Sequence, residues 1–326
     1  MKIGILGTGN IAKSMARTLN RMDEVTCYAI ASRTMERAEQ FKSDYDFEKA
    51  YGTYEEMVKD EDVELVYIAT PHSHHYEHIK LCLEQGKHVL CEKSFTVNAI
   101  EAKEVIQIAR EKGLLLAEAI WTRYMPSRKH IKEVLSSGII GNPYMLTANL
   151  GYLISNVPRI VTPSLAGGAL LDVGVYPINF ALMAFGSDIE SISTDAVLSE
   201  DGIDLQNSIT LKYRDGKMAV LNSSVIALTD RQGVISGDDG YMVVENINNC
   251  EKIRVYSRER KEIKCIVMPI QISGYEYQVR SCINAIKEGK VECEEMPHSE
   301  TIRVMELMDT LRAKWGVKYP QEQNIF

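Results

Sequence analysis

The chain has 326 residues, 45% of them apolar and 25% charged, which is the composition of a folded globular protein and excludes disordered and fibrous classes. At roughly 100–200 residues per domain, this length favours two domains. The formal net charge is −8, from 37 basic and 45 acidic residues, and no basic cluster supports a general nucleic-acid binder.

The cysteine pattern and the N-terminus indicate a compartment. Seven cysteines are scattered, mostly in apolar runs and without a C-x-x-C pair, as is usual for buried thiols in a reducing cytosol. The sequence MKIGILGTGN begins with a strand and not with a secretory signal, and no run approaches about 18 uninterrupted apolar residues. We therefore expect a cytoplasmic protein without a membrane partner.

Residues 1 to about 120 alternate apolar strands with amphipathic helices. Strands are predicted at 2–7, 25–32, 65–70, 88–93 and 114–119, with a weaker one near 50–51, and helices at 11–22, 34–45, 53–60, 73–86 and 98–113. Continuous apolar strands separated by helices predict a parallel sheet covered on both faces, and the right-handed crossover rule makes it doubly wound. We assign residues 1–120 to a Rossmann domain of the α/β class.

The pattern changes after residue 120. A helix at 126–138 precedes alternating stretches between 191 and 256, and the turn Arg214–Lys217 joins two of them as a hairpin. A last helix is predicted at 299–316. Residues 121–326 are therefore expected to form an α+β domain with a large, mostly antiparallel open sheet.

A glycine turn after the first strand is typical of a dinucleotide site. The residues Gly7, Thr8, Gly9, Asn10, Ile11 and Ala12 match G-x-G-x-x-A between a strand and a helix. The first glycine allows a tight turn, the second lets backbone N–H groups approach a pyrophosphate, and the small third residue keeps helix and strand close. A turn without a ligand is the alternative.

The end of the second strand favours NADP(H) over NAD(H). An acid that binds the ribose 2′-hydroxyl is usual there, but this chain has Ser32 followed by Arg33, with Arg37 four residues on. A hydroxyl and a guanidinium can bind a 2′-phosphate, which a carboxylate would repel. Alternatively, both arginines are solvated helix residues and NAD(H) also serves.

Four histidines lie between residues 72 and 78, after the next strand. His74 and His78 are four residues apart and could bind Zn²⁺, so a zinc hydrolase is one alternative function. No H-E-x-x-H or cysteine pair supports a metal, and in a doubly wound sheet this loop lies beside the glycine turn. We therefore predict no metal, and cofactor contacts from Thr70, Pro71, His72 and His75.

Lys93 ends the strand HVLCEK and should project at the carboxyl edge of the sheet, toward the nicotinamide. Hydride transfer at a C–O carbon needs an acid or base for the oxygen and a cation to stabilise negative charge, and lysine supplies the cation. A structural salt bridge, for example with Glu92, is the alternative.

Asp172 and Tyr176 follow the glycine-rich turn LAGGALL at i,i+4 on a predicted helix. A carboxylate and a phenol in one cleft could bind a polyol hydroxyl and exchange its proton, and a nearby lysine would lower the tyrosine pKa. Alternatively, Asp172 caps the helix and Tyr176 lies in the core.

Five ordered motifs, GTGNIA, ATPHSHH, CEKS, AEAIWTRYMP and PSLAGGALLDVGVYP, resemble the glucose-fructose oxidoreductase/inositol dehydrogenase/MocA family along nearly the whole chain. The last two are most similar to its dimeric dihydrodiol dehydrogenase branch. The resemblance implies an NAD(P)-dependent oxidoreductase for sugars, cyclic polyols or diols, and a homodimer or higher oligomer formed through the second domain's open sheet. A dinucleotide-responsive regulator without catalysis is the alternative from another class.

The resemblance also implies roles for residues. The lysine of the family's E-K-P motif falls on Lys93, its aspartate on Asp172 and its acid/base residue on Tyr176. Trp121 and Arg123 match residues near the nicotinamide and substrate, Arg159 matches a substrate residue, and Glu92 lies with the cofactor contacts. One departure is Ser94 in place of the proline. Because a cis bond before a residue other than proline costs about 2.5–4 kcal/mol, we predict a trans bond there.

Overall fold

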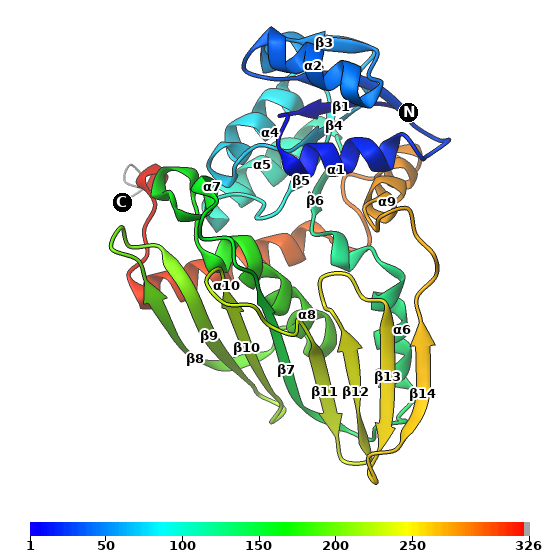
Figure 1. Cartoon of the computed structure of the whole chain (residues 1–326), viewed down its shortest axis with the longest axis vertical. Coiled ribbons are helices and arrows are strands. Elements are labelled where there is room, and N and C mark those ends of the chain that lie inside the picture. The colour runs from blue at the N-terminus through cyan, green and yellow to red at the C-terminus, as the bar shows by residue number, and fades with distance from the viewer. Residues whose placement is uncertain (323–326) are drawn as a thin grey trace. The chain divides into compact units, whose positions relative to one another are not determined.

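The computed structural model describes residues 1–322 and divides into two compact units (Figure 1). The first unit contains residues 1–124 and 271–306, and the second contains 125–270 and the chain from residue 307. The fold class predicted from the sequence, a parallel Rossmann sheet followed by a large, mostly antiparallel sheet, is confirmed.

The sheet of the first unit has six parallel strands in the order β3-β2-β1-β4-β5-β6. Their bounds are β1 (Lys2–Leu6), β2 (Thr26–Ala31), β3 (Lys49–Tyr51), β4 (Leu65–Ile68), β5 (His88–Glu92) and β6 (Leu116–Ala119). Strands β1, β4 and β5 are buried almost throughout, as expected for strands covered on both faces. The strand order reverses between β1 and β4, where doubly wound folds bind ligands.

The helices of this unit begin and end where local chemistry allows. They are α1 (Asn10–Leu19), α2 (Met35–Tyr45), α3 (Tyr54–Val58), η1 (His72–His74), α4 (His75–Glu84), α5 (Ala99–Lys112), η2 (Trp121–Arg123) and α9 (Glu276–Lys287). The side chains of Thr34, Thr53 and Asn98 cap α2, α3 and α5. Gly113, in the left-handed conformation, ends α5.

Residues 271–306 return to the first unit, although the sequence-based division at residue 120 assigned them to the second domain. The Leu116 N–H donates to the Val291 carbonyl at 3.0 Å, so this segment lies along the start of β6. Arg280 on α9 pairs with Glu24 at 2.5 Å. The boundary between the units falls within α10 (His298–Trp315), and a continuous helical pattern gives no sequence signal for such a boundary.

The second unit is built on eight strands in the order β14-β13-β12-β11-β7-β10-β9-β8 (Figure 1). Their bounds are β7 (Pro143–Gly151), β8 (Ile189–Leu198), β9 (Asp204–Tyr213), β10 (Met218–Ser224), β11 (Gly233–Gly237), β12 (Gly240–Glu245), β13 (Lys252–Ser257) and β14 (Glu262–Val267). All pairs are antiparallel except β7 with β10. The predicted hairpin is confirmed as β9–β10, with Gly216 at φ +88°.

One face of this sheet is covered by helices and the other is open. The helical elements are α6 (Pro126–Ser136), α7 (Pro158–Val161), η3 (Pro163–Leu165), the π-helical turn η4 (Leu170–Gly174), α8 (Val175–Phe185) and η5 (Pro320–Glu322). On β9, Ile209 and Leu211 are buried, whereas Ser208 and Lys212 on the opposite face are exposed. The alternation is typical of a sheet with one core face.

Within residues 1–322, one helical stretch, Pro163–Phe185, is long and apolar enough by composition to cross a membrane, with a mean hydropathy of 1.5. In the second unit, however, 89% of its most apolar window is buried. A buried core helix passes the same test, so this stretch is weak evidence for a membrane span.

Candidate functional site

The glycine turn after β1 leaves the start of α1 open. Gly7 has φ +99°, and a Cβ there would lie 3.0 Å from the Ala69 carbonyl, so the turn packs directly against the end of β4. Gly9 precedes α1, and a Cβ there would have no atom within 4 Å. Among residues 1–322, no side chain caps this helix, and its first turn holds no acid. Unsatisfied N–H groups and the positive end of the helix dipole therefore face open space, which fits a dinucleotide pyrophosphate.

The end of β2 brings hydroxyl and guanidinium groups to the turn. The Thr8 and Ser32 hydroxyl oxygens are 3.4 Å apart, and Ser32 is buried. Arg33 and Arg37 are exposed, and no acid stands at the end of this strand. Burial of the His74 ring lowers its pKa, and the positive charge of the nearby Arg33 lowers it further. This donor set fits a 2′-phosphate better than it fits a bare ribose.

The histidines after β4 bind groups of their own loop and of the turn after β5. His75 is fully buried, with Nδ1 2.8 Å from the Ser94 carbonyl and Nε2 2.8 Å from the Thr70 carbonyl. Burial lowers its pKa to about 4, so the ring is neutral and donates to one of these oxygens. His78 meets the Thr70 hydroxyl at 2.9 Å.

These contacts remove the main ground for a zinc site. The His74 ring stacks on His78 and the buried His72 ring meets His75 edge-on, with 5.8 Å between centroids in each pair. Over residues 1–322, no group of three or more His, Cys, Asp or Glu side chains is arranged to hold a metal ion. Instead, His75 ties the loop after β4 to the turn after β5, which fixes both at the carboxyl edge of the sheet.

Lys93 lies at that edge, directly after β5, and is half-buried. Its backbone N–H donates to Glu92 Oε2 at 3.3 Å, and the buried Tyr67 hydroxyl donates to Glu92 Oε1. The prediction of a trans bond was wrong, because the Lys93–Ser94 peptide bond is cis. The backbone of this turn is held by neighbouring groups, including the His75 ring on the Ser94 carbonyl, and so does not depend on proline alone.

The residues after β6 are engaged inside the first unit. Trp121 stacks on Tyr275 with 4.4 Å between ring centroids. Arg123 is buried and pairs with Glu300 at 3.1 Å. The guanidinium predicted to lie near the substrate is thus also part of a buried ion pair with α10.

Glu118 on β6 is a buried acid that the sequence analysis missed. Its side chain is 1% exposed, and neither carboxyl oxygen has a hydrogen-bond partner within residues 1–322. Burial, the largest cause, raises its pKa to about 7; the negative charge of Glu92 adds to this, while the positive charges of Arg123 and Lys93 oppose it. Its place near the end of an apolar strand is the signal that singled out Lys93, and could have found Glu118 too.

In the second unit, Asp172 lies in the π-helical turn and Tyr176 in the first turn of α8, and both are buried. Arg159, from α7, donates to Asp172 Oδ1 at 2.7 Å, so two of the predicted substrate residues meet directly. Asp172 does not cap the first N–H of this helical run, because the Leu170 N–H donates to Asp204. Lys93 belongs to the first unit, whereas Asp172 and Tyr176 belong to the second.

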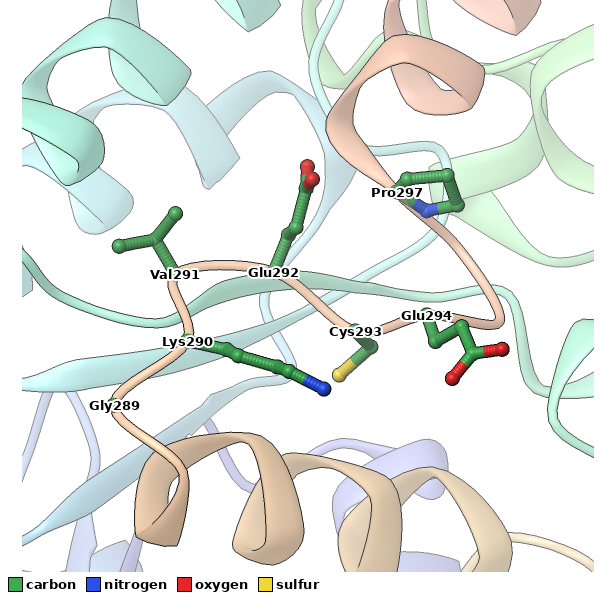
Figure 2. Close-up of a pocket in the computed structure, with 7 residues that line it drawn as sticks. All are labelled: Gly289, Lys290, Val291, Glu292, Cys293, Glu294 and Pro297. Carbon is green, nitrogen blue, oxygen red and sulfur yellow. The ribbon is translucent and has the colours of Figure 1, made fainter.

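A cavity of about 580 Å³ lies elsewhere in the first unit, along one chain segment (Figure 2). Figure 2 shows the Glu292 carboxylate pointing away from the Cys293 thiol. Since this segment follows the start of β6, the cavity is at the amino edge of the parallel sheet, opposite the glycine turn. It holds none of the predicted site residues; its lining is Gly289, Lys290, Val291, Glu292, Cys293, Glu294 and Pro297.

Comparisons with known proteins cover both units. Residues 1–119 match the model of an oxidoreductase family with an NAD-binding Rossmann fold, and residues 129–243 match the GFO/IDH/MocA C-terminal domain. The chain is 34% identical over 327 residues to a trans-1,2-dihydrobenzene-1,2-diol dehydrogenase from Xenopus tropicalis, covering 98% of this chain and 99% of that protein. The Homo sapiens protein of the same name is 33% identical over 331 residues, covering 99% of each.

A solved structure is similar over nearly the same length. It is a 3-ketoreductase from Actinomadura kijaniata in complex with NADP and TDP-benzene, with a TM-score of 0.87 and 26% identity. The match covers 96% of this chain and 97% of that chain. The similarity therefore extends beyond the dinucleotide-binding part of the fold.

Proposed function

Because this chain belongs to the GFO/IDH/MocA oxidoreductase family, whose first domain is an NAD-binding Rossmann fold, we propose that it transfers a hydride between NADP(H) and a C–O carbon of a sugar, cyclic polyol or vicinal diol. The observation that carries the proposal is the open, uncapped start of α1 at Gly9. The relatives named as diol dehydrogenases and the NADP-bound ketoreductase support the substrate class.

Different residues of the first unit would bind different parts of the cofactor. The N–H groups after Gly9 would bind the pyrophosphate, and Ser32, Arg33 and Arg37 the 2′-phosphate. The loop after β4, through Thr70, Pro71 and His72, would line the dinucleotide, with Glu92 and Trp121 toward its nicotinamide end. The predicted contact from His75 would be indirect, because this fully buried ring binds the Thr70 and Ser94 carbonyls and so supports the loop from behind. NAD(H), which lacks the phosphate, would bind more weakly. When bound, the nicotinamide accepts or supplies the hydride.

The chain's own side chains would move the proton and stabilise charge. We propose that Tyr176 exchanges the proton of the substrate hydroxyl and that the Lys93 ammonium favours both the phenolate and the alkoxide. Asp172, oriented by Arg159, would bind a second substrate hydroxyl. The ketoreductase has been crystallised with a lysine replaced by alanine or glutamate and with a tyrosine replaced by phenylalanine. Those two positions are separated by nearly the same number of residues as Lys93 and Tyr176.

We also propose a cytoplasmic homodimer formed through the open face of the second unit's sheet, without nucleic-acid or membrane partners. Met145 and Met218, cross-strand partners on β7 and β10, are 50% and 39% exposed there. Apolar side chains that are exposed on the open face of a sheet are a common self-association surface. Light scattering should give twice the mass of the chain, and Met145→Lys should give the monomer; a monomeric wild type would remove this part of the proposal.

The activity is tested by a substrate screen followed by one substitution. Aldoses, inositols, anhydro-sugars and vicinal diols, and their oxidised forms, would be assayed with both cofactors by absorbance of the reduced nicotinamide. Tyr176→Phe should lower kcat by about 100-fold or more while NADPH affinity stays within twofold. Tyr144→Phe, which removes an exposed phenol, is the control. Equal turnover by Tyr176→Phe would reject its acid/base role, and NADPH binding without turnover of any compound would favour a regulator.

A further inference from the structure

A buried carboxylate holds the start of the helical run that carries Asp172 and Tyr176. Asp204, the first residue of β9, is 0% exposed. Its Oδ2 accepts the Leu170 N–H at 2.7 Å. Leu170 begins the π-helical turn, so an acid 34 residues away in sequence binds the N-terminal end of this helix.

Asp204 belongs to a chain of buried hydrogen bonds that reaches a second strand. Asn207 Nδ2 donates to the same oxygen, Asp204 Oδ2, at 2.9 Å. Ser223 Oγ on β10 donates to Asn207 Oδ1 at 2.8 Å, and these two residues are direct cross-strand partners. The helix start is thus anchored to the two strands beneath it.

Two glycines of the sequence motif leave room for this chain of hydrogen bonds. Gly168 has φ +117°, and a Cβ there would lie 2.3 Å from Asp204 Oδ1. A Cβ on Gly174 would lie 2.9 Å from Ser223 Oγ. Part of the AGGALLDVG motif therefore serves the contact between the helix start and Asp204, beyond any direct contact with a ligand.

Keeping an acid in this position is costly. Asp204 Oδ1 has no hydrogen-bond partner within the described residues, and burial raises the pKa of the carboxyl to about 7. Asn207, the Leu170 N–H and the buried Arg312 oppose that increase, and the buried Tyr319 also lies near the acid. An apolar residue would avoid the cost of burying the acid, but it would leave the Leu170 N–H and the Asn207 amide without their acceptor.

We propose that Asp204, supported by Asn207 and Ser223, is a positioning residue that fixes the turn carrying Asp172 and Tyr176 for catalysis, an inference that rests on the proposed function. The carboxylate touches neither substrate nor cofactor in this assignment. It acts by fixing the first N–H of the helix, since a shift of about 1 Å in a reacting group costs up to about 100-fold in rate.

The test compares three variants at a temperature well below their melting points. Asp204→Ala removes the acceptor, Asp204→Asn keeps an acceptor without charge, and Asp201→Asn is the exposed control three residues away. We expect kcat to fall by about tenfold or more in Asp204→Ala, by less in Asp204→Asn and not in the control. The NADPH dissociation constant should stay within twofold, and amide exchange should accelerate across residues 168–176.

The outcomes separate this inference from the proposed function. A folded Asp204→Ala protein with kcat within twofold of wild type, or with unchanged exchange at residues 168–176, would overturn the positioning role. If Asp204→Ala does not fold, Asp204→Asn and Ser223→Ala decide, and wild-type turnover in both would overturn it. If the wild type turns over no substrate, the proposed function fails, whereas amide exchange still reports whether Asp204 holds the turn.

Discussion

The starts of two helices, one in each unit, differ in whether a side chain of the protein binds their N–H groups. At α1, Gly9 offers no side chain, the first turn holds no acid, and a Cβ would meet only open space. At the helical run beginning with Leu170, a buried aspartate from another strand binds the first N–H, and a Cβ on Gly168 would collide with that aspartate.

The difference separates two uses of glycine and of the helix dipole. An open helix start is available to an external anion, whereas one that already holds an internal carboxylate has no need of a ligand. We therefore interpret the first as a binding position and the second as a support for residues that follow it. Substitutions at these two starts should have opposite consequences for stability and for binding.

The largest expected effect is on the closed start. Gly168→Ala places a methyl group against Asp204 at a positive φ, and should lower the unfolding free energy of the second unit by roughly 2–4 kcal/mol. Gly138→Ala is the control, since it shares the positive φ but would meet no atom within 4 Å. Urea unfolding measures both. A Gly168→Ala protein no less stable than Gly138→Ala would contradict the crowded contact.

The next effect is on the open start. Gly9→Asp adds a carboxylate where the pyrophosphate would bind, and should weaken NADPH binding by about 100-fold or more through charge repulsion. Its melting temperature should be unchanged or higher, because aspartate is a favourable residue before a helix. Gly9→Ala adds a side chain without charge, and so separates the effect of steric bulk on NADPH binding from the effect of the negative charge. Fluorescence titration and a thermal melt give both quantities, and unaltered NADPH affinity would mean that the dinucleotide does not use this helix.

A smaller effect is expected beside the open start. Arg33→Ala should raise the NADPH dissociation constant by about tenfold, the usual size of a lost charge-assisted hydrogen bond, and leave that for NADH within twofold. Arg214→Ala, an exposed arginine on the β9–β10 turn, is the control. If Arg33→Ala weakens both cofactors equally, the arginine does not read the 2′-phosphate.

The smallest effect concerns a second buried acid, Glu118, neither of whose carboxyl oxygens accepts a hydrogen bond within residues 1–322. Glu118 holds its proton up to about pH 7 when folded, against an ordinary pKa of 4.5. The stability this contributes is complete below pH 4.5 and is lost as pH rises through 7. The increase in melting temperature that Glu118→Gln gives over the wild type should therefore be larger at pH 8 than at pH 5. Glu111→Gln, at an exposed site, is the control and should show no such dependence on pH. An equal increase in melting temperature at both pH values for Glu118→Gln would contradict the raised pKa of Glu118.

Local patterns predicted the fold better than they predicted the site. Apolar runs, a glycine turn and a four-residue hairpin depend on neighbouring residues, so the parallel sheet and the β9–β10 pair could be read from them. The return of residues 271–306 to the first unit depends on contacts far apart in sequence. The hydrogen bond from Leu170 to Asp204 is of the same kind, since no periodicity links a turn to an acid on a later strand. The cis bond before Ser94 could not be predicted, because the sequence shows only that a cis bond before a residue other than proline is costly. Contacts such as that of the His75 ring with the Ser94 carbonyl join residues far apart in sequence.

The position of β7 in its sheet has a consequence for how the polypeptide folds during synthesis. This strand is the first of the eight to leave the ribosome, yet it is central, and its partners β10 and β11 begin only at Met218 and Gly233. About half of the second unit must be translated before either edge of β7 can pair with a neighbouring strand. During that interval the nascent chain presents an exposed strand, which makes this stretch the one where chaperone binding would matter most.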